Sequence, residues 1–248
     1  TTDTHTGVPW LKDVPALDSV AIGEGEEIML RLTEALSNSV PDLSTVLGLT
    51  WRTKSGGSAQ NVPAEKPPDL ERLPHPARKQ PPDRFLGLPI CNLLASRGCA
   101  HQCYFCSIAA WHRLCGGPRV RLREPEQIAD EMALLYAQGY RIFNFHDDHF
   151  FLPRPAASLE RFQRLDAALR ARSVGRIAFA VKCRPDHVDE TVYRFLKEMG
   201  LFRVFLGIEA GTEESLVNLG RRQSLADNER ALKVVNELKL HACFNLLI

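Results

Sequence analysis

Three cysteines lie within eight positions of one another, Cys99, Cys103 and Cys106, in the segment SRGCAHQCYFCS. Thiolates are ligands for zinc and for iron–sulfur clusters, so three thiols at C-x3-C-x2-C spacing can wrap one inorganic centre. A closed tetrahedral ion needs four ligands. The spacing therefore predicts either an ion completed by another side chain or a cluster with one open position.

The composition is that of an ordinary globular protein. The chain has 248 residues, 44% hydrophobic and 25% charged, and a formal net charge of +1. This charge gives no electrostatic reason to expect nucleic acid or a membrane surface as a partner. The sequence has no apolar run of transmembrane length and no secretory signal at its start, and its seven cysteines are an odd number. We therefore expect a cytoplasmic protein whose cysteines bind metal or do chemistry.

From residue 86 onward, short apolar runs alternate with amphipathic segments. Each run is rich in Val, Ile and Phe, as expected for strands that are buried on both faces. The runs are LPICNLLAS (88–96), RIFNFHD (141–147), RIAFAVK (176–182), LFRVFLGIE (201–209) and HACFNLLI (241–248). This alternation predicts an α/β fold, either a parallel barrel or a doubly wound sheet. The cysteines follow the first strand, at the carboxyl end where barrel active sites are built.

Four helices are predicted between these strands, and their ends are marked in the sequence. Pro125 begins the first, which Gly139 ends, and the second has apolar residues at helical spacing from position 159 to position 169. Asp189 caps the third, and Ser224 with Asp227 forms a capping box for the fourth.

The cysteine motif, with Phe105 before its last Cys and a parallel barrel around it, resembles that of the radical S-adenosylmethionine superfamily. The resemblance implies that Cys99, Cys103 and Cys106 ligate a [4Fe–4S] cluster and that S-adenosylmethionine occupies the fourth iron. It also implies reductive cleavage of this cofactor to a 5′-deoxyadenosyl radical. The backbone at Phe105 is then expected near the adenine. The expected fold is a partial TIM-like barrel over residues 86–248, truncated at its C-terminus.

Polar residues at the other strand ends extend the resemblance. Asp147 and Asp148 match the acidic residues that receive the amino group of S-adenosylmethionine, although the common Gly-Gly-Glu form is absent. Glu209 lies in a segment similar to the family's Gly-Ile-Glu-Ser-Gly and is expected to contact the ribose or amino acid part of the cofactor. Arg184 is interpreted as a carboxylate or ribose partner, with a rim salt bridge as the alternative. Asn245 faces either the barrel interior or the core.

The first third of the chain resembles the end of a cobalamin-binding domain found in one branch of the superfamily. We expect residues 1–62 to be the C-terminal part of this Rossmann-like domain and residues 63–85 to be a proline-rich linker. The missing earlier part would leave this chain a weak binder of cobalamin. The residues that carry the match are His5, Asp18, Gly23, Glu24, Gly25 and Glu26.

The resemblance predicts an enzyme with a [4Fe–4S] cluster, S-adenosylmethionine and, in this branch, cobalamin as cofactors. A methyltransferase acting on an unactivated carbon is the primary interpretation, and a radical cyclase, a rearrangement enzyme or a methylthiotransferase is the alternative. The implied partners are a small-molecule or natural-product substrate and an electron donor such as flavodoxin or ferredoxin.

The alternative of another class is a zinc-binding interaction module, in which His101 or Cys115 completes the three cysteines. Cys91, Cys183 and Cys243 fall on predicted strands and are interpreted as inert core thiols.

Overall fold

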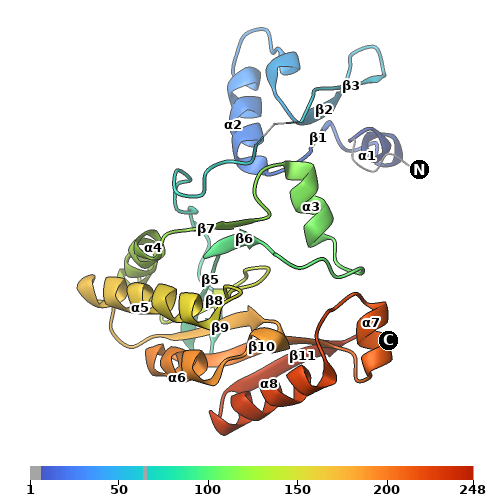
Figure 1. The fold of residues 1–248 in the computed structure, drawn as a ribbon. Coiled ribbons are helices and arrows are strands. Elements are labelled where there is room, and N and C mark those ends of the chain that lie inside the picture. Colours follow the sequence, from blue (N-terminus) through green and yellow to red (C-terminus); the bar gives the residue numbers. More distant parts are fainter. Residues whose placement is uncertain (1–6, 64–65, 248) are drawn as a thin grey trace. The chain divides into compact units, whose positions relative to one another are not determined.

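The computed structural model describes residues 7–63 and 66–247 (Figure 1). The chain forms two compact units. One comprises the residues up to Leu73 together with Ser107–Arg119, and the other comprises Pro74–Cys106 together with Val120 onward. His5, part of the match to the cobalamin-binding domain, lies outside the described residues. None of the described helices is long and apolar enough to cross a membrane.

The larger unit is built on a six-stranded sheet. Its strands are β4 (Arg84–Phe85), β5 (Leu88–Leu93), β8 (Ile142–Phe145), β9 (Ala178–Cys183), β10 (Leu201–Glu209) and β11 (His241–Leu246). They lie in the order β11-β10-β9-β8-β5-β4, and all neighbours are parallel except the β4–β5 pair. Each of the five predicted runs coincides with one of the parallel strands, although β9 extends one residue beyond its run.

The strand order decides between the two predicted folds. Neighbours in the parallel part follow the chain from β5 to β11 without a reversal. A doubly wound sheet reverses its order at a switch point, whereas a barrel adds each strand beside the previous one. The sheet is therefore part of a barrel, as the alternation of strands and helices allowed.

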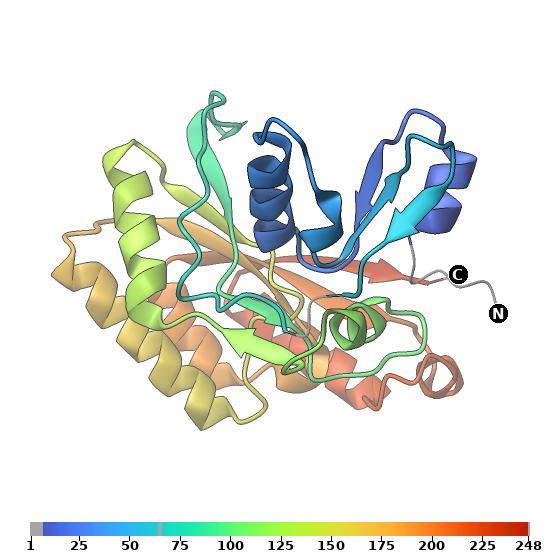
Figure 2. The same cartoon turned by 90° about the horizontal axis from the view of Figure 1, so that it is seen from above.

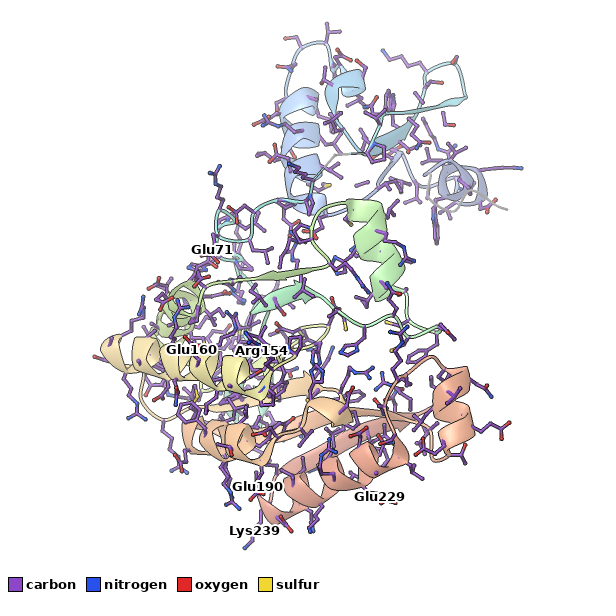
Figure 3. All side chains as sticks on the ribbon, in the orientation of Figure 1. Glu71, Arg154, Glu160, Glu190, Glu229 and Lys239 are labelled. Atoms are coloured by element: carbon purple, nitrogen blue, oxygen red, sulfur yellow. The ribbon has the colours of Figure 1, made fainter. Side chains whose placement is uncertain are left out.

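Helices lie along one side of this curved sheet (Figures 1 and 2). They are α4 (Pro125–Ala137), α5 (Pro155–Ala171), α6 (Glu190–Met199) and α8 (Leu225–Glu237). The Asp189 side chain accepts from Val192 N, and Ser224 with Asp227 forms the capping box, so both predicted caps are confirmed. Acidic residues on these helices are exposed, among them Glu160, Glu190 and Glu229, which are labelled in Figure 3.

The apolar core of this unit lies between the helices and the sheet. Phe143, Phe145 and Val204 of the strands are at most 1% exposed, as are Met132 and Phe162 of the helices. Burying one such side chain contributes about 1.5 to 3 kcal/mol. This core fixes the strands and therefore the positions of the loops at their carboxyl ends.

A buried carboxylate ties part of the proline-rich segment to this core. Glu131 of α4 is 2% exposed and accepts from Arg78 at 2.9 Å and from Arg123 at 2.7 Å, while His75 Nδ1 lies 3.6 Å away. Two guanidinium groups compensate this buried charge, so residues 75 and 78 are held in defined positions.

Short elements were not predicted from the sequence. In the larger unit they are β6 (Ser96–Gly98), β7 (Val120–Leu122), the 3-10 helix η2 (Pro185–His187) and α7 (Glu213–Asn218). Strands β6 and β7 pair antiparallel and flank the cysteine loop and the segment after it. Elements of three to six residues are too short to show a hydrophobic period.

The smaller unit holds a three-stranded antiparallel sheet in the order β1-β2-β3. Its elements are α1 (Val8–Asp13), β1 (Ser19–Ala21), α2 (Gly25–Leu36), the 3-10 helix η1 (Leu43–Thr45), β2 (Leu49–Arg52), β3 (Ser58–Gln60) and α3 (Ile108–Cys115). A hairpin joins β2 to β3 and turns at Gly56 and Gly57. Ile28, Ala35, Val46 and Leu49 form a small core.

Candidate functional site

The cysteine loop follows β6 of the larger unit, and Cys99, Cys103 and Cys106 are free and partly buried. Burial raises the pKa of the Cys99 thiol, and the neighbouring Cys103 and Cys106 raise it further, against the lowering effect of a backbone hydrogen bond from His101. The three sulfurs are therefore close enough to interact electrostatically.

The three thiols supply sulfur ligands from one loop. Sulfur ligands suit zinc as well as iron–sulfur clusters. A structural zinc ion would need a fourth protein ligand, whereas thiolates are the usual ligands of a [4Fe–4S] cluster.

Two buried arginines point at one of these sulfurs. Arg184 Nη1 lies 3.5 Å and Arg221 Nη1 lies 3.4 Å from Cys103 Sγ. Arg184 is held by Asp186 through two contacts of 2.9 Å, and Arg221 donates to Gln223 Oε1 at 2.7 Å. Cationic N–H donors stabilise negative charge on the atom that they face. The site is thus built to hold an anionic sulfur at position 103.

The loop is also anchored by its backbone. Tyr104 N donates to Leu219 O at 2.9 Å. Gly220 has φ +65°, and a Cβ added there would lie 2.8 to 2.9 Å from three atoms of the Tyr104 ring. Only a glycine fits both this conformation and this contact. The segment after α7 therefore fixes the middle of the cysteine loop.

The Asp147 side chain binds the backbone after β5. This residue is 0% exposed, and both carboxylate oxygens accept from Ala95 N at 3.1 Å, while the Ser96 hydroxyl donates to Oδ1. Burial raises the pKa of Asp147 to about 6, although these hydrogen bonds act in the opposite direction. Its carboxylate holds the chain between β5 and β6.

The Asp148 side chain accepts a hydrogen bond from the next part of the same segment. Its Oδ2 accepts from Gly98 N at 2.9 Å, one residue before the first cysteine. Gly98 has φ +97°, a conformation that favours glycine. The two adjacent carboxylates after β8 thus fix the backbone that leads into the cysteine loop.

Glu209 ends β10 in a left-handed conformation, with φ +63°. It is buried, its Oε2 accepts from Asn245 Nδ2 at 2.7 Å, and its Oε1 lies 3.8 Å from Arg221 Nη1. A residue other than glycine in this region costs of order 1 to 3 kcal/mol and is found where function requires it. The bend directs the carboxylate toward the arginine that also contacts Cys103.

The predicted residues therefore fall into two sets. Arg184 and Arg221 both contact Cys103, and Arg221 also lies near Glu209. Asp147 and Asp148 instead accept hydrogen bonds from the backbone that leads into the cysteine loop. The Phe105 side chain is 44% exposed beside the loop. Sequence reasoning missed Arg221 and Gln223, because they follow a short helix and belong to no motif.

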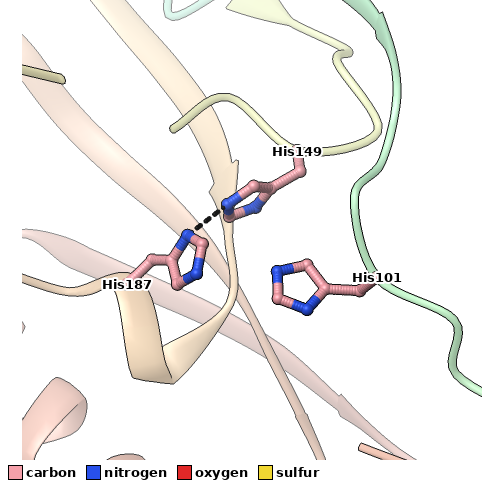
Figure 4. A group of neighbouring side chains, drawn as sticks. All are labelled: His101, His149 and His187. Atoms are coloured by element: carbon pink, nitrogen blue, oxygen red, sulfur yellow. Dashed lines mark hydrogen bonds between the residues drawn. The ribbon is translucent and has the colours of Figure 1, made fainter. Parts of the chain in front are cut away.

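Three histidines also meet at the strand ends (Figure 4). His101 lies in the cysteine loop, His149 follows β8, and His187 ends η2. His149 Nε2 lies 2.7 Å from His187 Nδ1, and the His101 ring centroid is 5.1 Å from that of His187. Burial lowers the pKa of His149 to about 2 and that of His101 to about 4, with contributions from the charges around them. The sequence interpretation did not group them.

The smaller unit contains a cavity of about 580 Å³. Gly23 and Glu24, from the Gly-Glu-Gly-Glu turn, line it together with Glu27 and Ile28 of α2. Cavities of this volume are in the range that holds small-molecule ligands. The turn that resembles a cobalamin-binding domain therefore borders a hollow within its own unit.

A partial parallel barrel with a three-cysteine loop after its first strand defines an iron–sulfur type of site. The profile of the Radical SAM superfamily matches residues 93–248, which include the loop and all later strands. The chain belongs to this superfamily.

Relatives match over nearly the whole chain. A protein named as an uncharacterized methyltransferase from Pyrococcus horikoshii is 29% identical over 99% of this chain and 52% of its own length. An anaerobic magnesium-protoporphyrin IX monomethyl ester cyclase from Rubrivivax gelatinosus is 26% identical over 92% of this chain and 40% of its own. The chain thus spans about half the length of the curated relatives that it matches, or less.

A solved structure has a similar fold. The radical S-adenosylmethionine methyltransferase TsrM from Kitasatospora setae, solved with cobalamin and a [4Fe–4S] cluster bound, superposes with a TM-score of 0.67. It is 22% identical and covers 96% of this chain and 47% of the TsrM chain. The similarity extends across both units of the present chain.

Proposed function

We propose that this chain is the cofactor-binding part of a cobalamin-dependent radical S-adenosylmethionine methyltransferase that acts on an unactivated carbon. The observation that carries the proposal is the loop of Cys99, Cys103 and Cys106 at the carboxyl end of the barrel strands, in a chain that belongs to this superfamily. Its similarity to a named methyltransferase and to the TsrM fold supports methyl transfer.

The residues present fit the cofactors. The three free cysteines on one loop would hold the cluster, because thiolates are the ligands of iron–sulfur clusters. A reduced [4Fe–4S] cluster supplies an electron to the sulfonium of S-adenosylmethionine, and cobalamin supplies a methyl carrier. In the smaller unit, the cavity beside Gly23 and Glu24 would take part in holding cobalamin.

The chain's own residues would bind and orient the cluster and S-adenosylmethionine. Arg184 and Arg221 stabilise negative charge at Cys103, and Glu209 offers a carboxylate to the ribose or amino acid part of S-adenosylmethionine. Asp148, whose carboxylate accepts from Gly98 N, would receive the amino group of S-adenosylmethionine, and Asp147 positions the chain between β5 and β6. The backbone at Phe105 would lie near the adenine.

The partners follow from this chemistry. An external one-electron donor such as flavodoxin or ferredoxin would reduce the cluster, and the substrate would be a small molecule or natural product. Seven free cysteines fit a reducing, cytoplasmic environment.

A radical cyclase is the second candidate, favoured by the similarity to the magnesium-protoporphyrin ester cyclase. Both reactions would use the same cysteine loop and arginines. They differ in whether a methyl group passes from S-adenosylmethionine to cobalamin.

The test uses anaerobically reconstituted protein that carries this chain, with cobalamin and S-adenosylmethionine deuterated in its methyl group. We expect about four irons per chain and trideuteromethylcobalamin detected by mass spectrometry. Cys103→Ala should lose the iron and the labelled product together. Four irons and 5′-deoxyadenosine without labelled methylcobalamin would favour the cyclase. Stoichiometric zinc without iron would favour the zinc-binding module.

A further inference from the structure

His101, His149 and His187 bring three imidazoles together from three different strand ends (Figure 4). One nitrogen from each ring lies within 4.8 Å of the other two. Ligands around a zinc ion lie about 3.4 Å apart, as Zn–N bonds of 2.0 to 2.1 Å require. The 2.7 Å contact between His149 and His187 is shorter than this spacing, so ring shifts of about 1 Å would convert the group into a coordination site.

The protonation state of the rings suits a metal ligand. Burial lowers the pKa of His149 to about 2 and also lowers that of His187, so both rings carry lone pairs near neutral pH. Burying a neutral imidazole is costly unless its nitrogens are satisfied, and His149 is the buried member of the group. One hydrogen bond between His149 and His187 accounts for one nitrogen of each of these two rings.

The surrounding charges do not exclude a cation. Arg184 and Arg221 lie near the rings, but the Arg184 guanidinium pairs with Asp186 at 2.9 Å, and Arg221 lies 3.8 Å from Glu209. Asp186 also acts directly on His101 and His187, where it favours positive charge. At His187 the effect of Asp186 exceeds that of Arg184, whereas at His149 the two arginines act without it.

We propose that His101, His149 and His187 bind a divalent first-row transition-metal ion of the zinc type, separate from the three cysteines. Imidazole nitrogens suit zinc, cobalt, nickel and iron better than the hard ions magnesium and calcium. Three histidines leave one position open in a tetrahedral site, and that position takes water or a substrate oxygen. The ion would hold an oxygen-bearing group of the substrate beside the cysteine loop.

The test titrates Co²⁺ into the reconstituted, oxidised protein after chelator treatment. The oxidised [4Fe–4S] cluster is diamagnetic, so high-spin Co²⁺ is visible by electron paramagnetic resonance. We expect about one Co²⁺ per chain without a thiolate-to-cobalt charge-transfer band, and an iron content unchanged at about four. His149→Gln and His187→Gln should each weaken Co²⁺ binding by at least about tenfold.

His146→Gln is the matched control, because His146 also follows β8 and its ring contacts Asn144 Nδ2 at 2.7 Å. This variant should bind Co²⁺ like the wild type. Wild-type protein that retains no Co²⁺ would overturn the proposal, as would retention that is equal in all variants. If His149→Gln loses iron through misfolding, His187→Gln and the wild-type titration still decide. Iron and cobalt are measured separately, so failure of the cluster assignment is distinguishable from failure of the histidine site.

Discussion

Arg221 donates to Cys103 Sγ at 3.4 Å from a position 118 residues further along the chain. The same guanidinium lies 3.8 Å from Glu209 Oε1, so one side chain connects the cysteine loop with the end of β10. Arg184, the residue after β9, approaches the same sulfur. The environment of the cysteine loop is therefore made by the later strands of the barrel.

Arg221→Lys and Arg221→Leu should lower the reduction potential of the cluster. Each substitution removes the guanidinium group that donates to Cys103. This donor favours the reduced cluster, because the reduced cluster carries more negative charge than the oxidised one. Loss of a hydrogen bond from a charged group costs about 1.5 to 3 kcal/mol, and only the part that differs between the two oxidation states shifts the potential, so the decrease should stay below about 130 mV. We expect a smaller decrease for Lys, measured by redox titration. Arg222→Asn, at an exposed neighbour with φ +52°, is the control, and an equal decrease there would contradict the assignment.

Gly220→Ala should loosen the cysteine loop. The new Cβ would lie 2.8 Å from the Tyr104 ring at a φ of +65°, and the left-handed conformation alone costs about 1 to 2 kcal/mol in other residues. We expect faster loss of iron in the presence of a chelator. Gly211→Ala, where an added Cβ meets nothing within 4 Å, should retain iron like the wild type. Equal retention in both variants would show that Tyr104 does not anchor the loop.

Asp147→Ala should destabilise the protein, and Asp148→Ala should act mainly on cofactor binding. Removing the Asp147 carboxylate leaves the buried Ala95 amide and Ser96 hydroxyl without their acceptor, which costs about 2 to 4 kcal/mol. Urea unfolding measures this loss, and equilibrium dialysis with S-adenosylmethionine measures binding. Ser96→Ala should reproduce a smaller part of the stability loss. A stable Asp147→Ala variant with weakened cofactor binding would support the role predicted from the sequence, in which Asp147 receives the amino group of S-adenosylmethionine.

Glu131→Gln should lower the free energy of unfolding by about 2 to 3 kcal/mol, because it leaves Arg78 and Arg123 facing a neutral amide. The value lies below that of a fully buried pair, since Arg78 is partly exposed. Glu160→Gln, on the outer face of α5, should change stability by less than about 0.5 kcal/mol. Similar unfolding midpoints for the two variants would mean that Glu131 does not hold the segment at residues 75 and 78.

The fold was predictable because its periodic signals are local and repeated. Apolar runs marked the parallel strands, and side chains such as Asp189 and Ser224 marked the helix starts by binding backbone amides within three residues. The choice between a barrel and a doubly wound sheet depends on strand order, which these local signals do not contain.

The candidate site was predictable only where its residues form a continuous motif in the sequence. The cysteine spacing and the segment around Glu209 are continuous in sequence, whereas Arg221 and the three histidines come together only through the folded barrel. Asp147 illustrates a second limit. A carboxylate at a strand end has the same sequence signature whether it faces a ligand or the amide of Ala95.

The contacts of Cys103 also constrain the order of events in biosynthesis. The thiol leaves the ribosome long before its two guanidinium partners, which come from residues 184 and 221. Contacts between residues so distant in the chain form late, after the intervening strands have paired. A nascent chain that ends before residue 221 thus displays the cysteines without the cations that complete their surroundings. Insertion of iron and sulfide into a lasting site must therefore wait until most of the barrel has been synthesised.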